Sequence, residues 1–255
     1  MEIEELRRLK GVRKVVMLTA YDCQMAKILD AAGVDILLVG DSLGMVVLGY
    51  GNTREVTMAD MVRHTEAVAR GTESAVVVSD MPINSYNAVG DALENARRLI
   101  DAGADAVKLE GNKPEVVRAL VSSGIPVMGH MGLLPQTAER FRVRGKRRSE
   151  AERIYADALE LDGLGVFSIV LECIPMGLAK RITGAVGSLT IGIGAGVHCD
   201  GQVLVVNDML GMEEGFKPKH VKPYAHLSET IKGAVLKFME DVRSGRFPDD
   251  RHSFH

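Results

Sequence analysis

The feature that most constrains the fold is a regular alternation of short apolar runs with longer amphipathic stretches. Eight runs rich in β-branched residues recur along the chain, and they are nearly continuous in apolar character. This pattern is typical of parallel strands that are buried on both faces. The expected strands are Val15–Ala20, Asp35–Asp41, Ala75–Met81, Ala106–Gly111, Pro126–Gly132, Ser168–Ile174, Thr190–Gly196 and Val203–Met209.

Amphipathic helical patterns lie between these runs and after them. Eight strands alternating with helices in 255 residues favour one closed (β/α)8 TIM barrel over an open α/β sheet, because such barrels take about 250 residues. No Pro/Ser-rich linker interrupts the chain, so we expect a single catalytic domain over residues 1–255. The expected helices are Cys23–Ala32, Met58–Arg70, Ala88–Ala102, Pro114–Ser122, Glu150–Leu161, Met176–Val186 and Ser228–Val242.

Bulk properties exclude several function classes. A net charge of −3, 4% aromatic residues and the absence of Trp argue against a nucleic-acid partner. The first residues do not resemble a secretory signal, and the most apolar stretch is interrupted by Glu172 and Pro175, which argues against a membrane span. Three widely spaced cysteines without a Cys-x-x-Cys pair are typical of free thiols in a reducing compartment. We therefore expect a cytoplasmic protein.

Ionisable residues stand at the ends of five of the expected strands. The carboxyl ends of parallel barrel strands share one rim, where barrel enzymes place their catalysis, so we expect these side chains to meet around one small volume. A polar residue is often the first residue of the loop after a strand. This would explain any one of the ionisable residues alone, but it explains the whole set poorly. The residues are Asp41, Asp80, Lys108, Glu110, His130 and Glu172.

The acids in this set predict a metal site. Buried like charges are costly unless they are paired or bound to a cation. The candidate ligands are all oxygens, which suits Mg²⁺ and argues against structural zinc. We predict Asp41, Asp80 and Glu110 as ligands, directly or through water. A 2-oxo acid could then fill two open metal positions, and the metal would stabilise its enolate.

The remaining rim residues have candidate roles in catalysis or binding. Glu172 follows the apolar run Phe167–Leu171, where desolvation should raise its pKa and make it a stronger base, although it could instead pair with a rim Lys or Arg. Lys108 could neutralise the substrate carboxylate or a developing oxyanion, or simply pair with Glu110. His130 could donate to the substrate or relay a proton, or be structural.

A basic run follows the fifth strand. It could bind nucleic acid or an anionic ligand tail, but a solvated loop or a mobile lid is the favoured interpretation. Its members are Arg140, Arg142, Arg144, Lys146, Arg147 and Arg148.

Specific motifs that cover nearly the whole chain carry a family resemblance. They are Leu18–Asp22, Val39–Gly49, Asp80–Pro82, Val107–Gly111, Pro126–Leu133, Val170–Pro175, Gly192–Gly196, Cys199–Gln202 and Asp241–Pro248. On these residues the chain resembles the ketopantoate hydroxymethyltransferase (3-methyl-2-oxobutanoate hydroxymethyltransferase) family.

The resemblance implies a TIM barrel that uses Mg²⁺, assembles as a homodecamer and works in pantothenate and coenzyme A biosynthesis. It implies transfer of a hydroxymethyl group from 5,10-methylenetetrahydrofolate, or a related pterin, to 3-methyl-2-oxobutanoate, giving 2-dehydropantoate. By this resemblance Asp41, Asp80 and Glu110 surround the metal, and Glu172 matches the general base. Asp41, Ser42 and Lys108 match substrate-binding positions, to which we add Asp80 and His130 as further substrate-binding candidates.

One stretch departs from the family pattern. After Leu134–Gln136 the family typically has a Gly-Gly-aromatic element and then Val-Gln-Gly, whereas this chain has Glu139–Gly145 with three arginines. Loop closure and the contacts to the pterin therefore do not follow from the resemblance.

The sequence is less consistent with two rival interpretations. An enzyme of the phosphoenolpyruvate mutase and isocitrate lyase type would also use Mg²⁺ and oxo-acid enolates, but it would need a catalytic Cys in a Lys-Lys-Cys-Gly-type element, which the sequence lacks. A barrel kept as a non-catalytic binding or assembly subunit would be expected to have lost some of the acids, and this chain retains them all.

Overall fold

A computed structural model describes residues 1–213 and 218–255. The chain divides into two compact units, Met1–Val205 and Val206–His255. In the described ranges, no helix combines the length and the apolar character that a membrane crossing requires. The expectation of one catalytic domain over 1–255 stays a prediction.

The first unit is built on a closed barrel of eight strands in sequence order, with every neighbouring pair parallel. The TIM-barrel prediction is thus confirmed. The strands are β1 Val15–Thr19, β2 Ile36–Val39, β3 Val76–Asp80, β4 Ala106–Glu110, β5 Val127–Gly132, β6 Ser168–Glu172, β7 Leu189–Ile193 and β8 Gly201–Leu204.

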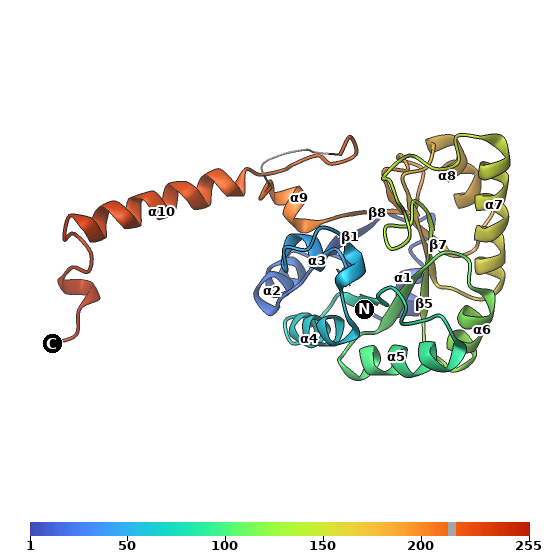
Figure 1. The fold of residues 1–255 in the computed structure, drawn as a ribbon, viewed down its shortest axis with the longest axis horizontal. Coiled ribbons are helices and arrows are strands. Elements are labelled where there is room, and N and C mark those ends of the chain that lie inside the picture. Colours follow the sequence, from blue (N-terminus) through green and yellow to red (C-terminus); the bar gives the residue numbers. More distant parts are fainter. Residues whose placement is uncertain (214–217) are drawn as a thin grey trace. The chain divides into compact units, whose positions relative to one another are not determined.

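Helices surround this barrel on the outside (Figure 1). The six helices predicted before the last strand are present, with bounds within three residues of those expected. They are α2 Cys23–Ala31, α4 Met58–Ala69, α5 Val89–Asp101, α6 Pro114–Ser122, α7 Arg148–Gly163 and α8 Met176–Thr183. Three short elements of the first unit were not predicted, namely α1 Ile3–Arg7, α3 Leu43–Val46 and the 3-10 turn η1 Thr53–Glu55.

The eighth strand was predicted in the wrong place. Instead of Val203–Met209, β8 begins at Gly201, and Val206–Leu210 forms the short helix α9. The register explains the error, because Gly201 pairs with Val15 of β1 and an added Cβ there would lie 2.6 Å from the Ile191 side chain. β8 therefore starts at Gly201, a position that has no room for a side chain, and a search for apolar residues does not identify such a start.

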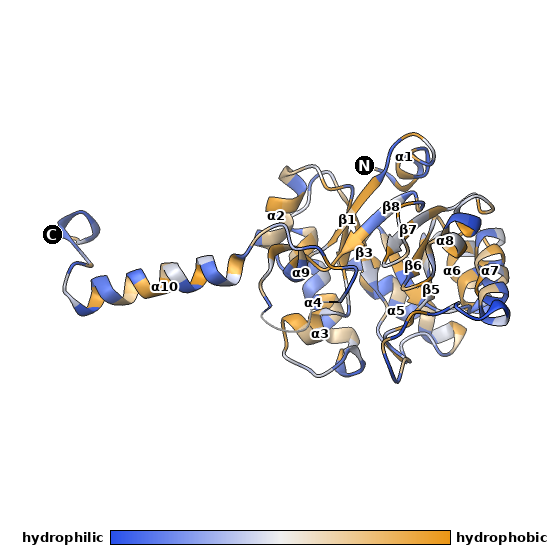
Figure 2. Ribbon diagram, turned by 90° about the horizontal axis from the view of Figure 1, so that it is seen from above, coloured by the Kyte–Doolittle hydropathy of each residue, from blue (hydrophilic) through white to orange (hydrophobic). Residues whose placement is uncertain are grey.

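Alternate residues of the strands fill the barrel. Val76 and Val78 of β3 point inward, as do Met128 of β5 and Val170 of β6, and all four belong to one buried cluster. Leu6 of α1 joins the same cluster and is fully buried. Strand β1, for example, is coloured as hydrophobic over most of its length (Figure 2). The period of two that buries these residues also decides which later residues of each strand face inward.

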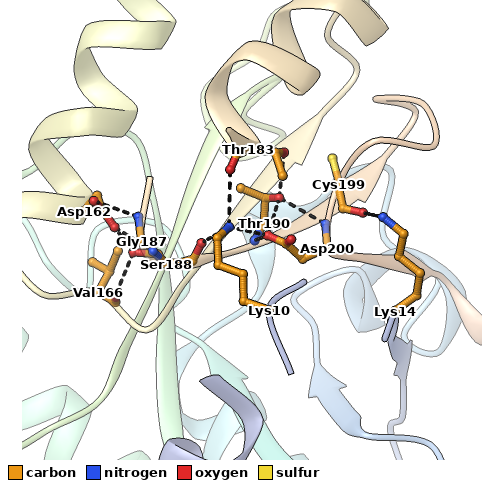
Figure 3. Close-up of polar contacts among 10 residues, drawn as sticks. All are labelled: Lys10, Lys14, Asp162, Val166, Thr183, Gly187, Ser188, Thr190, Cys199 and Asp200. Atoms are coloured by element: carbon orange, nitrogen blue, oxygen red, sulfur yellow. Dashed lines mark hydrogen bonds and ion pairs between the residues drawn. The ribbon is translucent and has the colours of Figure 1, made fainter. Parts of the chain in front are cut away.

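A polar network joins the amino-terminal ends of the last strands (Figure 3). Lys10 Nζ donates to Asp200 Oδ2 at 2.7 Å and to the carbonyl oxygen of Ser188 at 2.9 Å. Asp200 Oδ2 also accepts from the backbone N–H of Thr190 at 2.9 Å. Because these residues precede or begin β7 and β8, the network lies at the end of the barrel opposite the carboxyl ends of the strands.

Asp162 anchors the start of β7 in the same network. Its carboxylate accepts from the backbone N–H groups of Ser188 at 2.7 Å and Gly187 at 3.1 Å, and from the Ser188 hydroxyl. Burial alone would raise the pKa of Asp162, but these hydrogen bonds outweigh it, so the pKa lies below its ordinary value.

The second unit contains α9, the long helix α10 Leu227–Arg243 and the 3-10 turn η2 Asp250–His252. The predicted helix Ser228–Val242 is thereby confirmed. The segment after α10 folds back on it, with the rings of Phe238 and Phe247 in an edge-on contact at 5.5 Å between centroids. Arg246 also pairs with Asp241 of α10, with Nε 2.9 Å from Oδ1.

Candidate active site

The carboxyl ends of β3, β4, β5 and β6 bring most of the predicted site residues together. Asp80 continues the inward-facing series of Val76 and Val78, and Lys108 and Glu110 continue that of Ala106. The strand register pairs Asp80 with Lys108 and Glu110 with His130. Alternation and register therefore converge these groups on one volume, as the sequence predicted.

Lys108 and Asp80 form a buried ion pair. Lys108 Nζ lies 2.6 Å from Asp80 Oδ1, and the two residues are only 6% and 3% exposed. Burial alone would lower the pKa of Lys108, but the charges of Asp80, Asp41 and Glu110 raise it, so the lysine is a cation at neutral pH. The partner of Lys108 is thus Asp80 and not Glu110, the residue that the sequence offered for a structural role.

Asp41 lies beyond β2 and contacts the same pair. Its backbone N–H donates to Asp80 Oδ2 at 3.0 Å. Burial, with the nearby charge of Asp80, raises the pKa of Asp41 to about 7. Burial also raises the pKa of Glu110 well above its usual range, although Lys108 opposes the change. The pocket therefore holds more buried carboxyl groups than its one lysine can neutralise.

His130 lies between two of the acids. Its Nε2 is 3.1 Å from Glu172 Oε2, and its Nδ1 is 3.7 Å from Glu110 Oε1, yet neither ring nitrogen makes a well-aligned hydrogen bond among the described residues. Burial and the charge of Lys108 lower the pKa of His130. The imidazole is therefore neutral at pH 7 and has unused hydrogen-bonding capacity that faces the site.

Glu172 is the most accessible acid of the cluster. Its side chain is 15% exposed, compared with 4% for those of Asp80 and Glu110. No rim Lys or Arg pairs with it in the described chain, and His130 is its ion-pair neighbour. The expectation that desolvation strengthens it as a base stays a prediction.

Ser42 immediately precedes a short helix next to the cluster. It directly follows Asp41 and precedes α3, and its Oγ lies 2.9 Å from the hydroxyl oxygen of Tyr21. The structure thus places all seven predicted site residues around the carboxyl ends of strands β2 to β6.

Gln136 and Tyr86 belong to the site but were not predicted as functional residues. Gln136 Nε2 donates to Asp41 Oδ2 at 2.9 Å and to the carbonyl oxygen of Met81 at 3.0 Å, and its backbone N–H donates to Glu110 Oε2 at 3.1 Å. The Tyr86 hydroxyl donates to Gln136 Oε1. Gln136 is 2% exposed, so one buried residue holds two of the candidate metal ligands in position, Asp41 through its side-chain amide and Glu110 through its backbone N–H.

These side chains fit a divalent cation in charge and in donor chemistry. The acids near Lys108 are Asp41, Asp80, Glu110 and Glu172, and all of them offer oxygen donors of the kind that Mg²⁺ binds. The raised pKa values of Asp41 and Glu110 reflect buried negative charge that a cation would relieve. Within the described ranges, no three His, Cys, Asp or Glu side chains form a ready-made metal cluster.

Comparison with known proteins decides the family. A family model described as ketopantoate hydroxymethyltransferase matches residues 1–250. The 3-methyl-2-oxobutanoate hydroxymethyltransferase of Syntrophus aciditrophicus (strain SB) is 56% identical over 252 residues, covering 96% of this chain and 93% of that protein. The protein of the same name from Moorella thermoacetica is 54% identical over 248 residues, covering 94% and 92%.

The chain belongs to the ketopantoate hydroxymethyltransferase family. The resemblance seen in the sequence motifs is thereby confirmed, and the chain is an enzyme of this family rather than a non-catalytic barrel.

Solved structures relate the chain to a second class of enzymes only through the fold. Phosphonopyruvate hydrolase in complex with oxalate and Mg++ aligns with a TM-score of 0.66 at 12% identity, covering 99% of this chain and 93% of that chain. A 2,3-dimethylmalate lyase, a member of the PEP mutase/isocitrate lyase superfamily, gives 0.62 at 16% identity, covering 99% and 91%. The alternative considered from the sequence is therefore matched in architecture alone.

The stretch that departs from the family pattern, Glu139–Gly145, is partly fixed by polar contacts. Arg144 Nε pairs with Glu150 Oε1 at 2.6 Å, and the backbone N–H of Gly145 donates to the other oxygen of Glu150 at 2.8 Å. The backbone N–H of Arg144 also donates to the carbonyl oxygen of Cys173 at 2.8 Å. The segment is thus tied to the residue that follows Glu172.

Proposed function

We propose that this chain transfers a hydroxymethyl group to 3-methyl-2-oxobutanoate, giving 2-dehydropantoate for pantothenate and coenzyme A biosynthesis. The donor would be 5,10-methylenetetrahydrofolate or a related reduced pterin. One observation carries the proposal: Glu172 and His130 lie beside a buried Lys108–Asp80 pair with further acids around it, in a chain of this family.

Binding is assigned to the most buried groups. Asp41, Asp80 and Glu110 would hold Mg²⁺, some of them through water, and a bound Mg²⁺ would supply Lewis-acid stabilisation of negative charge on the oxo acid. Lys108 would face the substrate carboxylate as a fixed cation, because neighbouring acids keep it charged. Ser42 and the neutral imidazole of His130 would hydrogen-bond the substrate.

Glu172 is the proposed general base. It would remove the proton from C3 of the oxo acid, and His130, 3.1 Å away, would keep its carboxylate oriented. In the net reaction, the one-carbon unit would lose both of its carbon–nitrogen bonds to the pterin, at N5 and N10, and gain one bond to C3 and one to a water oxygen. The proton removed from C3 and one proton of the water would end on the two pterin nitrogens. The greater exposure of Glu172 leaves it accessible to a bound substrate.

Hydrogen exchange tests this proposal without any pterin. The protein is incubated with Mg²⁺ and 3-methyl-2-oxobutanoate in D₂O, and loss of the C3 hydrogen is followed by proton NMR. Glu172→Gln should slow the exchange by about 10²- to 10⁴-fold, the usual contribution of a general base, while calorimetry still detects substrate binding. Glu94→Gln, an exposed acid on α5, is the matched control. Normal exchange by Glu172→Gln would refute the base assignment, and no exchange by the unmodified protein would refute the proposed function.

The location and the assembly are proposed on family grounds. We place the enzyme in the cytoplasm as a homodecamer, with the whole chain acting as one catalytic domain. Sedimentation equilibrium at micromolar concentration should give ten times the mass of one chain, and a monomeric mass would contradict the assembly.

A further inference from the structure

A large cavity opens beside the candidate active site. It has a volume of about 1290 Å³ and lies between the loops that follow β4 and β5 and the first turns of α7. Gly111, which follows Glu110, lines it, and so does Gly132, which pairs with Glu172. The cavity therefore reaches the carboxyl ends of strands that carry the acids, and its volume exceeds the roughly 300–1,000 Å³ of typical small-molecule pockets.

The lining of this cavity is strongly basic. Six of its side chains are cationic and three are acidic, although the whole chain carries a net charge of −3. Glu150 pairs with Arg144 at 2.6 Å, and Asp157 lies 3.8 Å from Arg153. The other four cations make no ion pair or hydrogen bond with any described residue. These four are Arg140, Arg142, Lys146 and Arg147, and we call them the cationic lining.

Unpaired cations around a concave surface indicate an anionic ligand. Like charges that are held together repel one another, and a bound anion removes this cost. Arginine guanidinium groups bind carboxylates and phosphates through paired hydrogen bonds. The cavity adjoins the acids without containing them, so its occupant would extend outward from the reaction site. A small oxo acid bound among the acids would not extend into the cavity, whereas the one-carbon donor carries a long tail.

We propose that this cavity binds a polyanionic tail on the pterin donor, with the cationic lining as its recognition surface. The inference rests on the proposed function, because a reduced pterin is the donor there. A tail of γ-linked glutamates and a phosphate-bearing tail present the same chemistry to arginine, and the structure assigns the site to that shared chemistry.

Donors with different tails test the inference. The KM is measured for 5,10-methylenetetrahydrofolate with one glutamate and with five. The unmodified enzyme should have a KM at least about 10-fold lower for the five-glutamate donor, since each hydrogen bond to a charged group contributes enough for a change of that order. Raising the salt from about 50 to about 500 mM should weaken the preference, because exposed charges are screened. Equal KM values for the two donors, with no binding of tripolyphosphate, would overturn the inference.

A double variant ties any preference to the cavity. Arg140→Ala/Arg147→Ala should abolish most of the preference for five glutamates, and Arg63→Ala/Arg118→Ala, which removes equal charge from exposed positions on α4 and α6, should retain it. A preference that survives in the first variant would overturn the inference.

Free competitors distinguish the source of the tail. Penta-γ-glutamate and inorganic tripolyphosphate are titrated into the enzyme by calorimetry, and the tighter binder indicates a carboxylate or a phosphate tail. A short single-stranded oligonucleotide that binds more tightly than both would overturn the inference. This measurement needs no turnover, whereas the proposed function fails separately if the C3 hydrogen does not exchange.

Discussion

Replacing Gly132 by alanine should damage both stability and catalysis, because this glycine packs against the backbone of the proposed base. Gly132 has φ +100° and ends β5 opposite Glu172. An added Cβ would overlap the carbonyl oxygen of Glu172 and lie 2.7 Å from Ile174 Cγ2. The same carbonyl accepts from the backbone N–H of Leu133 at 2.9 Å, so neither strand can move without losing a hydrogen bond.

Two effects should lower the free energy of unfolding of Gly132→Ala. A positive φ costs an L-residue roughly 1–2 kcal/mol, and overpacking typically adds about 1–3 kcal/mol. We therefore expect Gly132→Ala to lower the free energy of unfolding by about 2–5 kcal/mol. A shift of about 1 Å at Glu172 should slow C3 hydrogen exchange about 100-fold.

Gly124→Ala is the matched control. Gly124 also has a positive φ, +76°, but nothing lies within 4 Å of its would-be Cβ. Gly124→Ala should lower the free energy of unfolding only by the cost of the positive φ, about 1–2 kcal/mol, and should leave the rate of C3 hydrogen exchange unchanged. Urea denaturation followed by circular dichroism gives the free energies of unfolding, and NMR in D₂O gives the rates. Equal losses of stability and unchanged exchange in both variants would refute the steric argument.

Three further predictions concern groups away from this contact. Lys10→Met should lower the free energy of unfolding, measured by urea denaturation, by about 2–3 kcal/mol, because it leaves the nearly buried carboxylate of Asp200 without its cation. The control Lys27→Met, at an exposed position, should change the free energy of unfolding by less than about 0.5 kcal/mol. The pKa of Asp162 is depressed in the folded protein, so its contribution to the free energy of unfolding is present above about pH 4 and is lost as the pH falls through the folded-state pKa. The difference in stability between the unmodified protein and Asp162→Asn should therefore be largest at pH 7 and shrink below pH 4. A difference that stays constant with pH would contradict this. Gln136→Leu should slow C3 hydrogen exchange at least about 10-fold, because Asp41 loses its amide donor; an unchanged rate would show that the amide does not position it.

The strand pattern predicted the fold and most of the site for a physical reason. Parallel strands place their carboxyl ends at one rim, and a period of two fixes which residues face inward, so Asp80, Lys108 and Glu110 could be placed without coordinates. The family motifs added Ser42, which no periodicity indicates.

Other contacts depend on features that no local pattern records. Gln136 and Tyr86 lie in loops, whose path across the rim is set by tertiary packing. The pairing of Lys108 with Asp80 depends on the register between β3 and β4. The start of β8 depends on a close approach at Gly201.

The network around Lys10 and Asp200 stabilises the end of the barrel that lies opposite the candidate active site. Because it ties the first residues of the chain to the amino-terminal ends of β7 and β8, substitutions there are remote from the acids at the opposite rim, and effects at well-separated positions usually add. Residues at this amino-terminal end of the barrel could be randomised alone, and the variants screened by melting temperature, to obtain a more heat-resistant enzyme. Turnover should then survive in most of the variants that fold.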